Sequence, residues 1–285
     1  MTHIKIKTTD FSVVFADNKS YFPKHKAGYN GIAEIRDRHK QSVFSRPKNF
    51  FVDNYAGLNL EHYFDNHYHP RSVMFHPRKH PMVLKEKDGK SVHLHQDAHA
   101  PWEITYDAIF RCEDPNRIFF RCIFKPKSDK IRNSAFLGVF FASYINHPKK
   151  IGINFRSNGR WKYFESQKHG DNSTICGSSD QMNIEFSRKI KKHWLFKSYA
   201  NLFYDKPIYY GINDNIAYII KFDDPEGYVR LCHSPSGAGP GNPAWDFFMI
   251  YPEPKKDEEY SISGNITMKK FKAESDMKKI LNEKK

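Results

Sequence analysis

The sequence lacks the cysteine pattern of a disulfide scaffold or a cysteine-bound metal. It has four cysteines in 285 residues, and none are paired at the CxxC spacing of metal sites. Cys112 and Cys122 lie in apolar, strand-like runs, where a free cysteine behaves as a small hydrophobic residue. We therefore expect all four thiols to be reduced.

Long apolar runs are also missing. No stretch approaches the roughly 18 apolar residues of a membrane-spanning helix. The chain begins Met-Thr-His-Ile-Lys-Ile-Lys, without the apolar core of a signal peptide. The sequence thus predicts a cytoplasmic protein with no membrane partner, the alternative being that a signal peptide has been removed from this chain.

No nucleotide or metal motif is present. The glycines of residues 229–247 match neither GxGxxG nor the P-loop. His93 and His95 would share one face of a strand, and His67 and His69 have the same spacing. Two such pairs among fifteen histidines are close to chance, and a metal needs three or four converging ligands. We expect no cofactor and no metal.

Positive charge is abundant but dispersed. The net charge is +14, which would attract polyanions such as nucleic acid, anionic membrane or acidic polysaccharide. Lysine and arginine usually stand beside aspartate or glutamate, and the densest basic run, residues 188–192, is short. A nucleic-acid partner is therefore not expected, although a basic polyanion-binding protein stays open as an alternative.

Aromatic residues and alternating patterns dominate what is present. The chain has 24 Phe and 16 Tyr, which favour pleated surfaces. From Trp102 to Cys112, apolar and polar residues alternate with period two. A turn at residues 113–116 leads into a second alternating run from Arg117 to Phe124, which predicts a long β-hairpin.

Similar short runs recur along the whole chain, with turns between them. The pattern predicts an all-β fold, a large antiparallel β-sandwich of more than a dozen strands. A short helix is expected only near the C-terminus, at residues 274–282. We interpret residues 1–272 as a single β-sandwich domain and 273–285 as a helical tail. Further strands are predicted near residues 11–15, 31–35, 49–53, 82–86, 91–95, 135–145, 151–155, 208–212, 216–222, 227–233, 245–251 and 259–271.

Two polar-aromatic segments interrupt the regular β pattern. Residues 55–78 mix carboxylate, imidazole and guanidinium groups with aromatic rings, the palette of a sugar site, and His62 and Arg78 are its candidate substrate ligands. The alternative is a polar surface loop. The polar, Gly/Ser-rich residues 166–181 are expected to form a long loop.

The second segment, residues 229–247, is a strand, a Gly/Pro-rich loop and another strand. Such a loop lets backbone approach a ligand closely. His233 and Asp246 are candidate partners for proton transfer, since an imidazole near neutral pKa works in either direction. The alternative is a structural crossover.

Four segments resemble an uncharacterised bacterial family associated with carbohydrate degradation: Tyr55–Asp65, Phe141–Ile145, Pro207–Gly211 and Cys232–Phe247. The string His-Ser-Pro-Ser-Gly followed by Asn-Pro-Ala-Trp-Asp-Phe is the most specific part. The resemblance implies a carbohydrate-related role without indicating a reaction.

The order of features also resembles the galactose mutarotase-like supersandwich: a Gly-Ile-Ala-Glu-Ile strand at 31–35, the hairpin 102–125, then an apolar strand ending near an Asn. That resemblance implies a histidine acid and a carboxylate base on a concave sheet. Asn146-His147 is similar to the family's Asn-His pair, but Pro148-Lys149-Lys150 replaces the expected aromatics. The fold also serves lyases, hydrolases and sugar-binding proteins.

Together these observations predict a carbohydrate-active protein, leaning towards an enzyme of epimerase, lyase or hydrolase type with a sugar or oligosaccharide ligand, possibly acidic. A non-catalytic carbohydrate-binding domain is the main alternative. The predicted site comprises His233 as acid or base, Asp246 as its partner, His62 and Arg78 as substrate ligands, and Tyr144 and Trp245 as walls.

Overall fold

The fold is built almost entirely from strands. The computed structural model describes residues 3–18, 30–38, 49–53, 55–190, 197–223, 225–272 and Met277. These ranges hold eighteen strands, and the helical segments within them are at most five residues long. The all-β prediction is confirmed. The helix expected at residues 274–282 lies outside the described residues apart from Met277, which is buried.

The largest sheet has nine strands, and every neighbouring pair in it is antiparallel. At its centre is the predicted hairpin, whose alternating exposure follows the alternating sequence. In spatial order the strands are β11 (Arg160–Phe164), β10 (Ile153–Ser157), β14 (Ile208–Asn213), β15 (Ile216–Phe222), β18 (Tyr260–Lys270), β8 (Arg117–Pro126), β7 (Ile104–Glu113), β6 (Ser91–Gln96) and β5 (Val83–Glu86).

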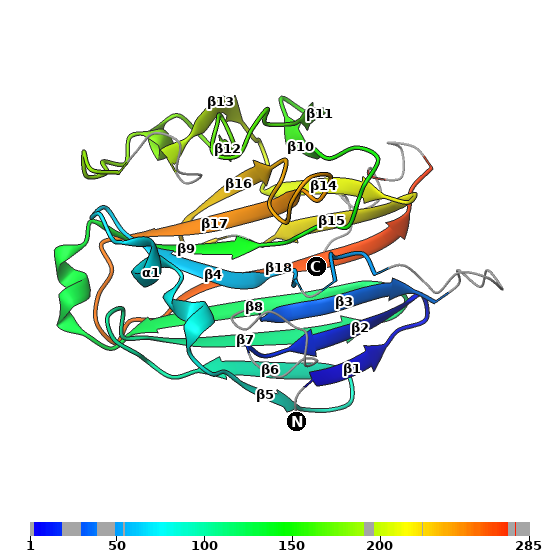
Figure 1. The fold of residues 1–285 in the computed structure, drawn as a ribbon, viewed down its shortest axis with the longest axis horizontal. Coiled ribbons are helices and arrows are strands. Elements are labelled where there is room, and N and C mark those ends of the chain that lie inside the picture. The colour runs from blue at the N-terminus through cyan, green and yellow to red at the C-terminus, as the bar shows by residue number, and fades with distance from the viewer. Residues whose placement is uncertain are drawn as a thin grey trace.

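Two smaller sheets lie side by side in front of the nine-stranded sheet (Figure 1). One has three strands, β1 (His3–Lys7), β2 (Phe11–Ala16) and β3 (Gly31–Asp37). The other has six, in the order β13 (Tyr199–Phe203), β12 (Thr174–Cys176), β16 (Tyr228–Ser234), β17 (Ala244–Pro252), β9 (Phe136–Ala142) and β4 (Asn59–Phe64). Among the strands of the described residues, only the β12–β13 pair is parallel.

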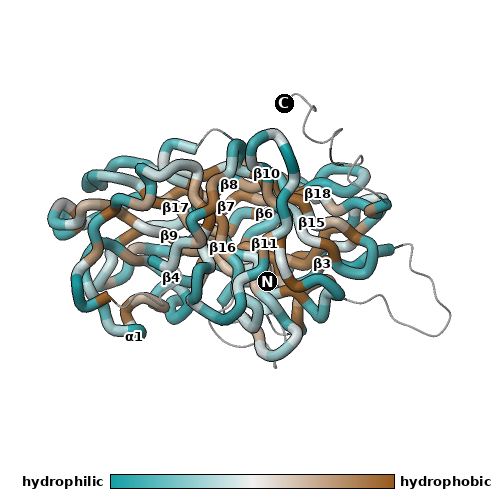
Figure 2. The backbone as a smooth tube through the Cα atoms, turned by 90° about the horizontal axis from the view of Figure 1, so that it is seen from above, coloured by the Kyte–Doolittle hydropathy of each residue, from teal (hydrophilic) through white to brown (hydrophobic). Residues whose placement is uncertain are grey.

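One large apolar core fills the space between the layers and draws side chains from all three sheets, for example Val13, Phe120 and Phe247. Figure 2 shows apolar positions gathered along the strands and polar ones in the connections. A second cluster, including Phe140 and Phe248, covers the opposite face of the six-stranded sheet. We call this second face the outer face.

Several local predictions need correction. The sequence predicts no strand within residues 55–65, yet residues 59–64 form strand β4. The predicted loop at 166–181 contains β12 and the short helix η3 (Asp180–Met182). Residues 49–53 form isolated bridges instead of a strand. β4 lies at the edge of its sheet and β12 has only three residues, so in both cases partners far along the chain decide the pairing.

The four cysteines are free and buried, which confirms the reduced state expected for them. The remaining helical segments are α1 (Arg71–Met74), η1 (His76–Lys79) and η2 (Asp129–Asn133). None of the described helices has the length and apolarity needed to cross a lipid bilayer.

Candidate active site

The hairpin of β16 and β17 separates the predicted site residues onto two faces. Its register pairs His233 with Trp245 and Cys232 with Asp246. Residues paired directly across two strands share a face, and successive residues along a strand alternate between faces. His233 and Trp245 therefore lie on the inner face, whereas Asp246 lies on the outer one.

On the inner face, His233 is fully enclosed. Its Nδ1 accepts a hydrogen bond from the backbone N–H of Ser166 at 3.1 Å, and its Nε2 lies 2.9 Å from the carbonyl oxygen of Ile151. Burial lowers the pKa of His233 to about 4, so the ring is neutral near pH 7. The indole N–H of Trp245 donates to the same Ile151 carbonyl at 2.6 Å. Both rings thus fasten Ile151 to the sheet.

On the outer face, Asp246 is a buried carboxyl group. Its Oδ1 accepts a hydrogen bond from the backbone N–H of Ser143 at 2.9 Å. Burial raises the pKa of Asp246 well above its usual value, and the negative charge of Glu61 raises it further, against the opposing effect of the Ser143 N–H. Its surroundings therefore favour the protonated, neutral carboxylic acid at Asp246.

Glu61 reaches the same face through an irregularity in β4. Opposite β9, the register shifts between Leu60 and His62, which leaves Glu61 as an extra residue. Such a bulge interrupts the alternation and places two consecutive residues on one side of the sheet. Leu60 and Tyr63 accordingly join the inner core, while His62 packs against Phe140 on the outer face.

Three side chains surround the Glu61 carboxylate. Its Oε2 accepts a hydrogen bond from the hydroxyl of Tyr144 at 2.5 Å. Its Oε1 lies 3.2 Å from Nη1 of Arg78 and 3.3 Å from Nε2 of His62. Burial alone would raise the pKa of Glu61, but His62, Arg78 and Tyr144 together hold it below its usual value. Glu61 is therefore ionised.

Arg78 reaches Glu61 from η1, which packs beside β4. Its guanidinium lies over the ring of Phe75, with Cζ 4.9 Å from the ring centroid. The ring of His62 contacts the same phenyl group, with the centroids 3.8 Å apart. Phe75 thus packs against both side chains that face the carboxylate.

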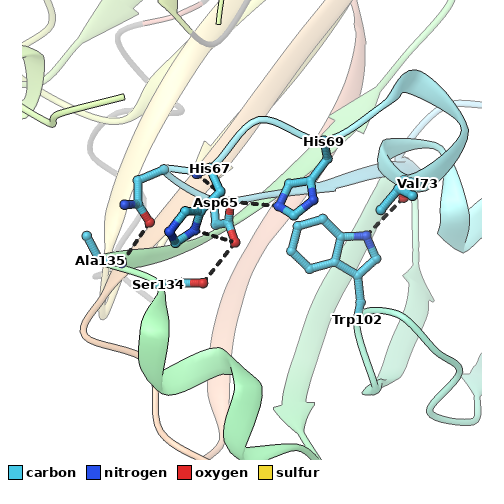
Figure 3. A network of polar contacts seen from close by, with 8 residues as sticks. Asp65, His67, His69, Val73, Trp102, Ser134 and Ala135 are labelled. Atoms are coloured by element: carbon cyan, nitrogen blue, oxygen red, sulfur yellow. Dashed lines mark hydrogen bonds and ion pairs between the residues drawn. The ribbon is translucent and has the colours of Figure 1, made fainter. Parts of the chain in front are cut away.

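A polar network holds the connection between β4 and the helical segments (Figure 3). Asp65 accepts hydrogen bonds from the hydroxyl of Ser134 at 2.8 Å and from the backbone N–H of His67 at 2.7 Å, and Nε2 of His69 lies 2.9 Å from it. The indole N–H of Trp102 donates to the carbonyl of Val73 in α1. This network fixes the segment that carries Phe75 and Arg78.

A cavity of about 870 Å³ lies near β13. Its lining includes the aromatic rings of Phe186 and Tyr199 and the charged groups of Lys168, Arg188 and Lys197. Tyr199 accepts a hydrogen bond from Nη1 of the buried Arg230, which lies over Phe248. Because β16 and β4 are three strands apart, Arg230 and His62 are separated by roughly 14 Å along the outer face.

The structure brings together four of the six predicted site residues. His62, Arg78 and Tyr144 all contact Glu61, and Asp246 is close enough for its pKa to respond to the Glu61 charge. It does not bring His233 or Trp245 to them, since both point into the core. Their predicted roles stay predictions without a contact to this group.

Sequence reasoning missed Glu61 as a site residue. The signal was present: two polar residues, Glu61-His62, stand together between Leu60 and Tyr63 in an otherwise alternating run. A doubled polar position of this kind indicates a bulge, and bulges are common next to functional sites.

Comparisons with known proteins identify the fold. No family model and no curated protein matches the sequence. Among solved structures, a candidate aldose 1-epimerase from Escherichia coli K12 matches with a TM-score of 0.55 and 7% identity, over 95% of this chain and 99% of that one. A GalM/aldose epimerase homologue from C. elegans matches with a TM-score of 0.53 and 8% identity, over the same shares. The predicted galactose mutarotase-like fold is confirmed.

Proposed function

We propose that this protein is an enzyme that acts on a sugar by acid–base chemistry, with Glu61 and Asp246 as the proton-transferring pair. One observation carries the proposal: two buried carboxyl groups lie on the outer face in different surroundings. Glu61 has the guanidinium of Arg78 beside it, whereas Asp246 meets a backbone N–H, and these surroundings favour opposite protonation states. Carboxyl pairs separated in this way divide the roles of base and acid.

The protonation states define the two roles. The ionised Glu61 is the group that can accept a proton from a sugar hydroxyl, and the neutral Asp246 is the group that can donate one. For an aldose, removing the proton of the anomeric hydroxyl while protonating the ring oxygen opens the ring. The reverse transfers close it on either face.

The groups around the pair suit a polyhydroxylated ligand. Arg78 and His62 are donors beside the carboxylate, and Tyr144 with its neighbouring ring Tyr55, 4.8 Å away between centroids, offers an aromatic wall. The likeness of the fold to aldose epimerase homologues supports a sugar as the substrate class. At 7–8% identity it supports no particular reaction.

The second candidate is sugar binding without turnover. It is favoured by the cavity near β13, which combines the rings of Phe186 and Tyr199 with three cationic side chains and the acidic Asp171 and Glu185. This composition fits a saccharide with an anionic substituent, which the basic charge of the chain would attract.

The test measures, by exchange NMR, how fast the protein interconverts the anomers of a panel of neutral aldoses and uronic acids. We expect Glu61→Gln and Asp246→Asn each to lower kcat by about 100-fold or more, the usual contribution of a positioned acid or base. Asp257→Asn is the control, because that exposed carboxylate pairs with Lys127 and contacts none of the residues proposed for the site.

Thermal melts and circular dichroism of each variant separate lost chemistry from lost fold. Turnover in the native protein that persists in both carboxyl variants would overturn the proposed roles. Saturable sugar binding with no turnover in the native protein would establish the second candidate instead.

A further inference from the structure

Three side chains of the kinds that bind metal ions lie together on the nine-stranded sheet, away from Glu61 and Asp246. His93 and His95 alternate along β6 with Val92 and Leu94, which are buried. Both imidazoles therefore point away from the core. The neighbouring strand β7 places Asp107 directly opposite His95. Strand periodicity therefore fixes all three side chains on one outward face.

The ligand atoms are already gathered around one point. Nε2 of His93 lies 2.7 Å from Oδ1 of Asp107, and Nδ1 of His95 lies 2.8 Å from the same oxygen. All three ligand atoms are within 4.8 Å of one another, which occurs in no other group of three such residues in the described part of the chain. Ligands of a tetrahedral zinc ion stand about 3.4 Å apart at bond lengths near 2.1 Å. Only small side-chain rotations separate the two arrangements.

A second carboxylate orients one of the imidazoles. Nε2 of His95 lies 3.2 Å from Oδ1 of Asp97, on the opposite side of the ring from Asp107. Metal-binding histidines usually donate their other N–H to a carboxylate or carbonyl, which fixes the tautomer and makes the ligand nitrogen more basic. This contact is independent of the three ligand atoms and points to the same use of His95 Nδ1.

A metal ion can reach these three side chains from solvent, although the positive charge of Lys85 opposes its binding. The side chains of His93, His95 and Asp107 are 25%, 34% and 31% exposed, so an ion and its water can enter. Lys85 on β5 is paired with His93, so its cationic side chain lies on the same face of the sheet. On the other side, β8 contributes Ile123 opposite Asp107.

We propose that His93, His95 and Asp107 form a binding site for a divalent transition-metal ion such as Zn²⁺. Two imidazoles and one carboxylate are ligands of the kind that Zn²⁺ binds, and three protein ligands leave at least one position for water. The site lies on the other sheet from Glu61 and Asp246 and does not depend on the sugar chemistry proposed for them. It replaces the expectation, drawn from the sequence, that no metal would be held.

The test is titration of the metal-free, chelator-treated protein with Zn²⁺ by calorimetry, with Cu²⁺ and electron paramagnetic resonance as the structural readout. We expect one saturable site and a Cu²⁺ spectrum with hyperfine splitting from two imidazole nitrogens. Asp107→Asn and His95→Ala should each weaken binding by at least about 100-fold. Asp97→Asn should weaken it by about 10-fold, the usual effect of removing a group that orients a ligand.

His67→Ala is the matched control, because His67 is also an exposed histidine beside a carboxylate, 3.5 Å from Asp65. It should bind Zn²⁺ as the native protein does. Lys85→Gln should bind severalfold more tightly, since it removes a nearby positive charge without touching a ligand. Absence of saturable binding at millimolar Zn²⁺, or binding unaffected by both Asp107→Asn and His95→Ala, would overturn the proposal.

Discussion

The two faces of the β16–β17 hairpin give neighbouring residues opposite roles. On the inner face, His233 and Trp245 are enclosed and hold the Ile151 carbonyl. On the outer face, Asp246 stands one residue away from Trp245 and is coupled to the charge of Glu61. Burial is nearly complete on both faces, so burial does not distinguish a structural group from a candidate catalytic one. The distinction comes from which charged groups each side chain meets.

The inner face should respond most strongly to loss of packing. Trp245 is fully buried and lies against Gly211, where an added Cβ would come within 2.3 Å of the indole ring. Trp245→Ala removes this contact and the hydrogen bond to Ile151, so we expect the free energy of unfolding to fall by about 3–5 kcal/mol. Urea denaturation followed by circular dichroism measures it.

Tyr68→Ala is the control for that comparison, because Tyr68 is 50% exposed. We expect it to change the free energy of unfolding by less than about 0.5 kcal/mol. A Trp245→Ala protein as stable as the Tyr68 variant would contradict the view that the inner face is structural.

A second prediction concerns the pH dependence contributed by His233. The folded-state pKa is about 4, below the value of about 6.5 for an unfolded chain. The unfolded state therefore binds the proton more tightly, and stability is lost as pH falls from about 6.5 towards 4. The loss is on the order of 3 kcal/mol, at 1.36 kcal/mol per pKa unit. His233→Gln, which cannot titrate, should lose that much less stability over the same range.

Urea denaturation at pH 7 and pH 4.5 measures this difference between the native protein and His233→Gln. His76, whose pKa is also lowered to about 4 by burial and by neighbouring cationic groups, is present in both proteins and cancels in the comparison. Equal losses in the two proteins would show that the buried imidazole is not neutral in the folded state.

The sequence predicted those features of the fold that depend on residues close together in the chain, namely strands and the face on which each side chain lies. The period-two run of residues 102–112 indicated the central hairpin because each side chain's burial follows from its position along one strand. The same rule, applied to Trp245-Asp246, places these two residues on opposite faces of the sheet, so they cannot line the same site. The residue types made both Trp245 and Asp246 candidates for the site, but the alternation along the strand leaves only Asp246 on the outer face.

The contacts of Glu61 could not be predicted in this way. Apart from the adjacent His62, its partners come from η1 and from just after β9, 17 and 83 residues along the chain. The bulge that places Glu61 on the outer face depends on pairing with β9. The sequence predicts no strand over residues 59–64 because charged and imidazole groups interrupt the apolar pattern there. Here the charges compensate one another, which allows the strand to be buried.

The last prediction is that the stability contributed by Asp246 on the outer face and by His233 on the inner face changes with pH in opposite directions. In the folded protein, the pKa of Asp246 lies well above its ordinary value because of burial and the Glu61 charge. The folded state therefore binds the proton more tightly than the unfolded state, and stability is lost as pH rises above about 4. This direction is opposite to that of His233, on the same hairpin. Asp246→Asn keeps a neutral side chain of the same shape and should not lose this stability.

We therefore expect Asp246→Asn to gain stability relative to the native protein as the pH rises from about 5 to about 8, because the native protein loses the stabilisation linked to the Asp246 proton over this range and the amide does not. Urea denaturation at both pH values measures the gain, and the anomer-exchange assay should find activity lost in the same sample. A stability difference that is constant with pH would mean that Asp246 is ionised in the folded protein. Glu61 would then need another partner as acid, because two ionised carboxylates cannot supply the proton that ring opening requires.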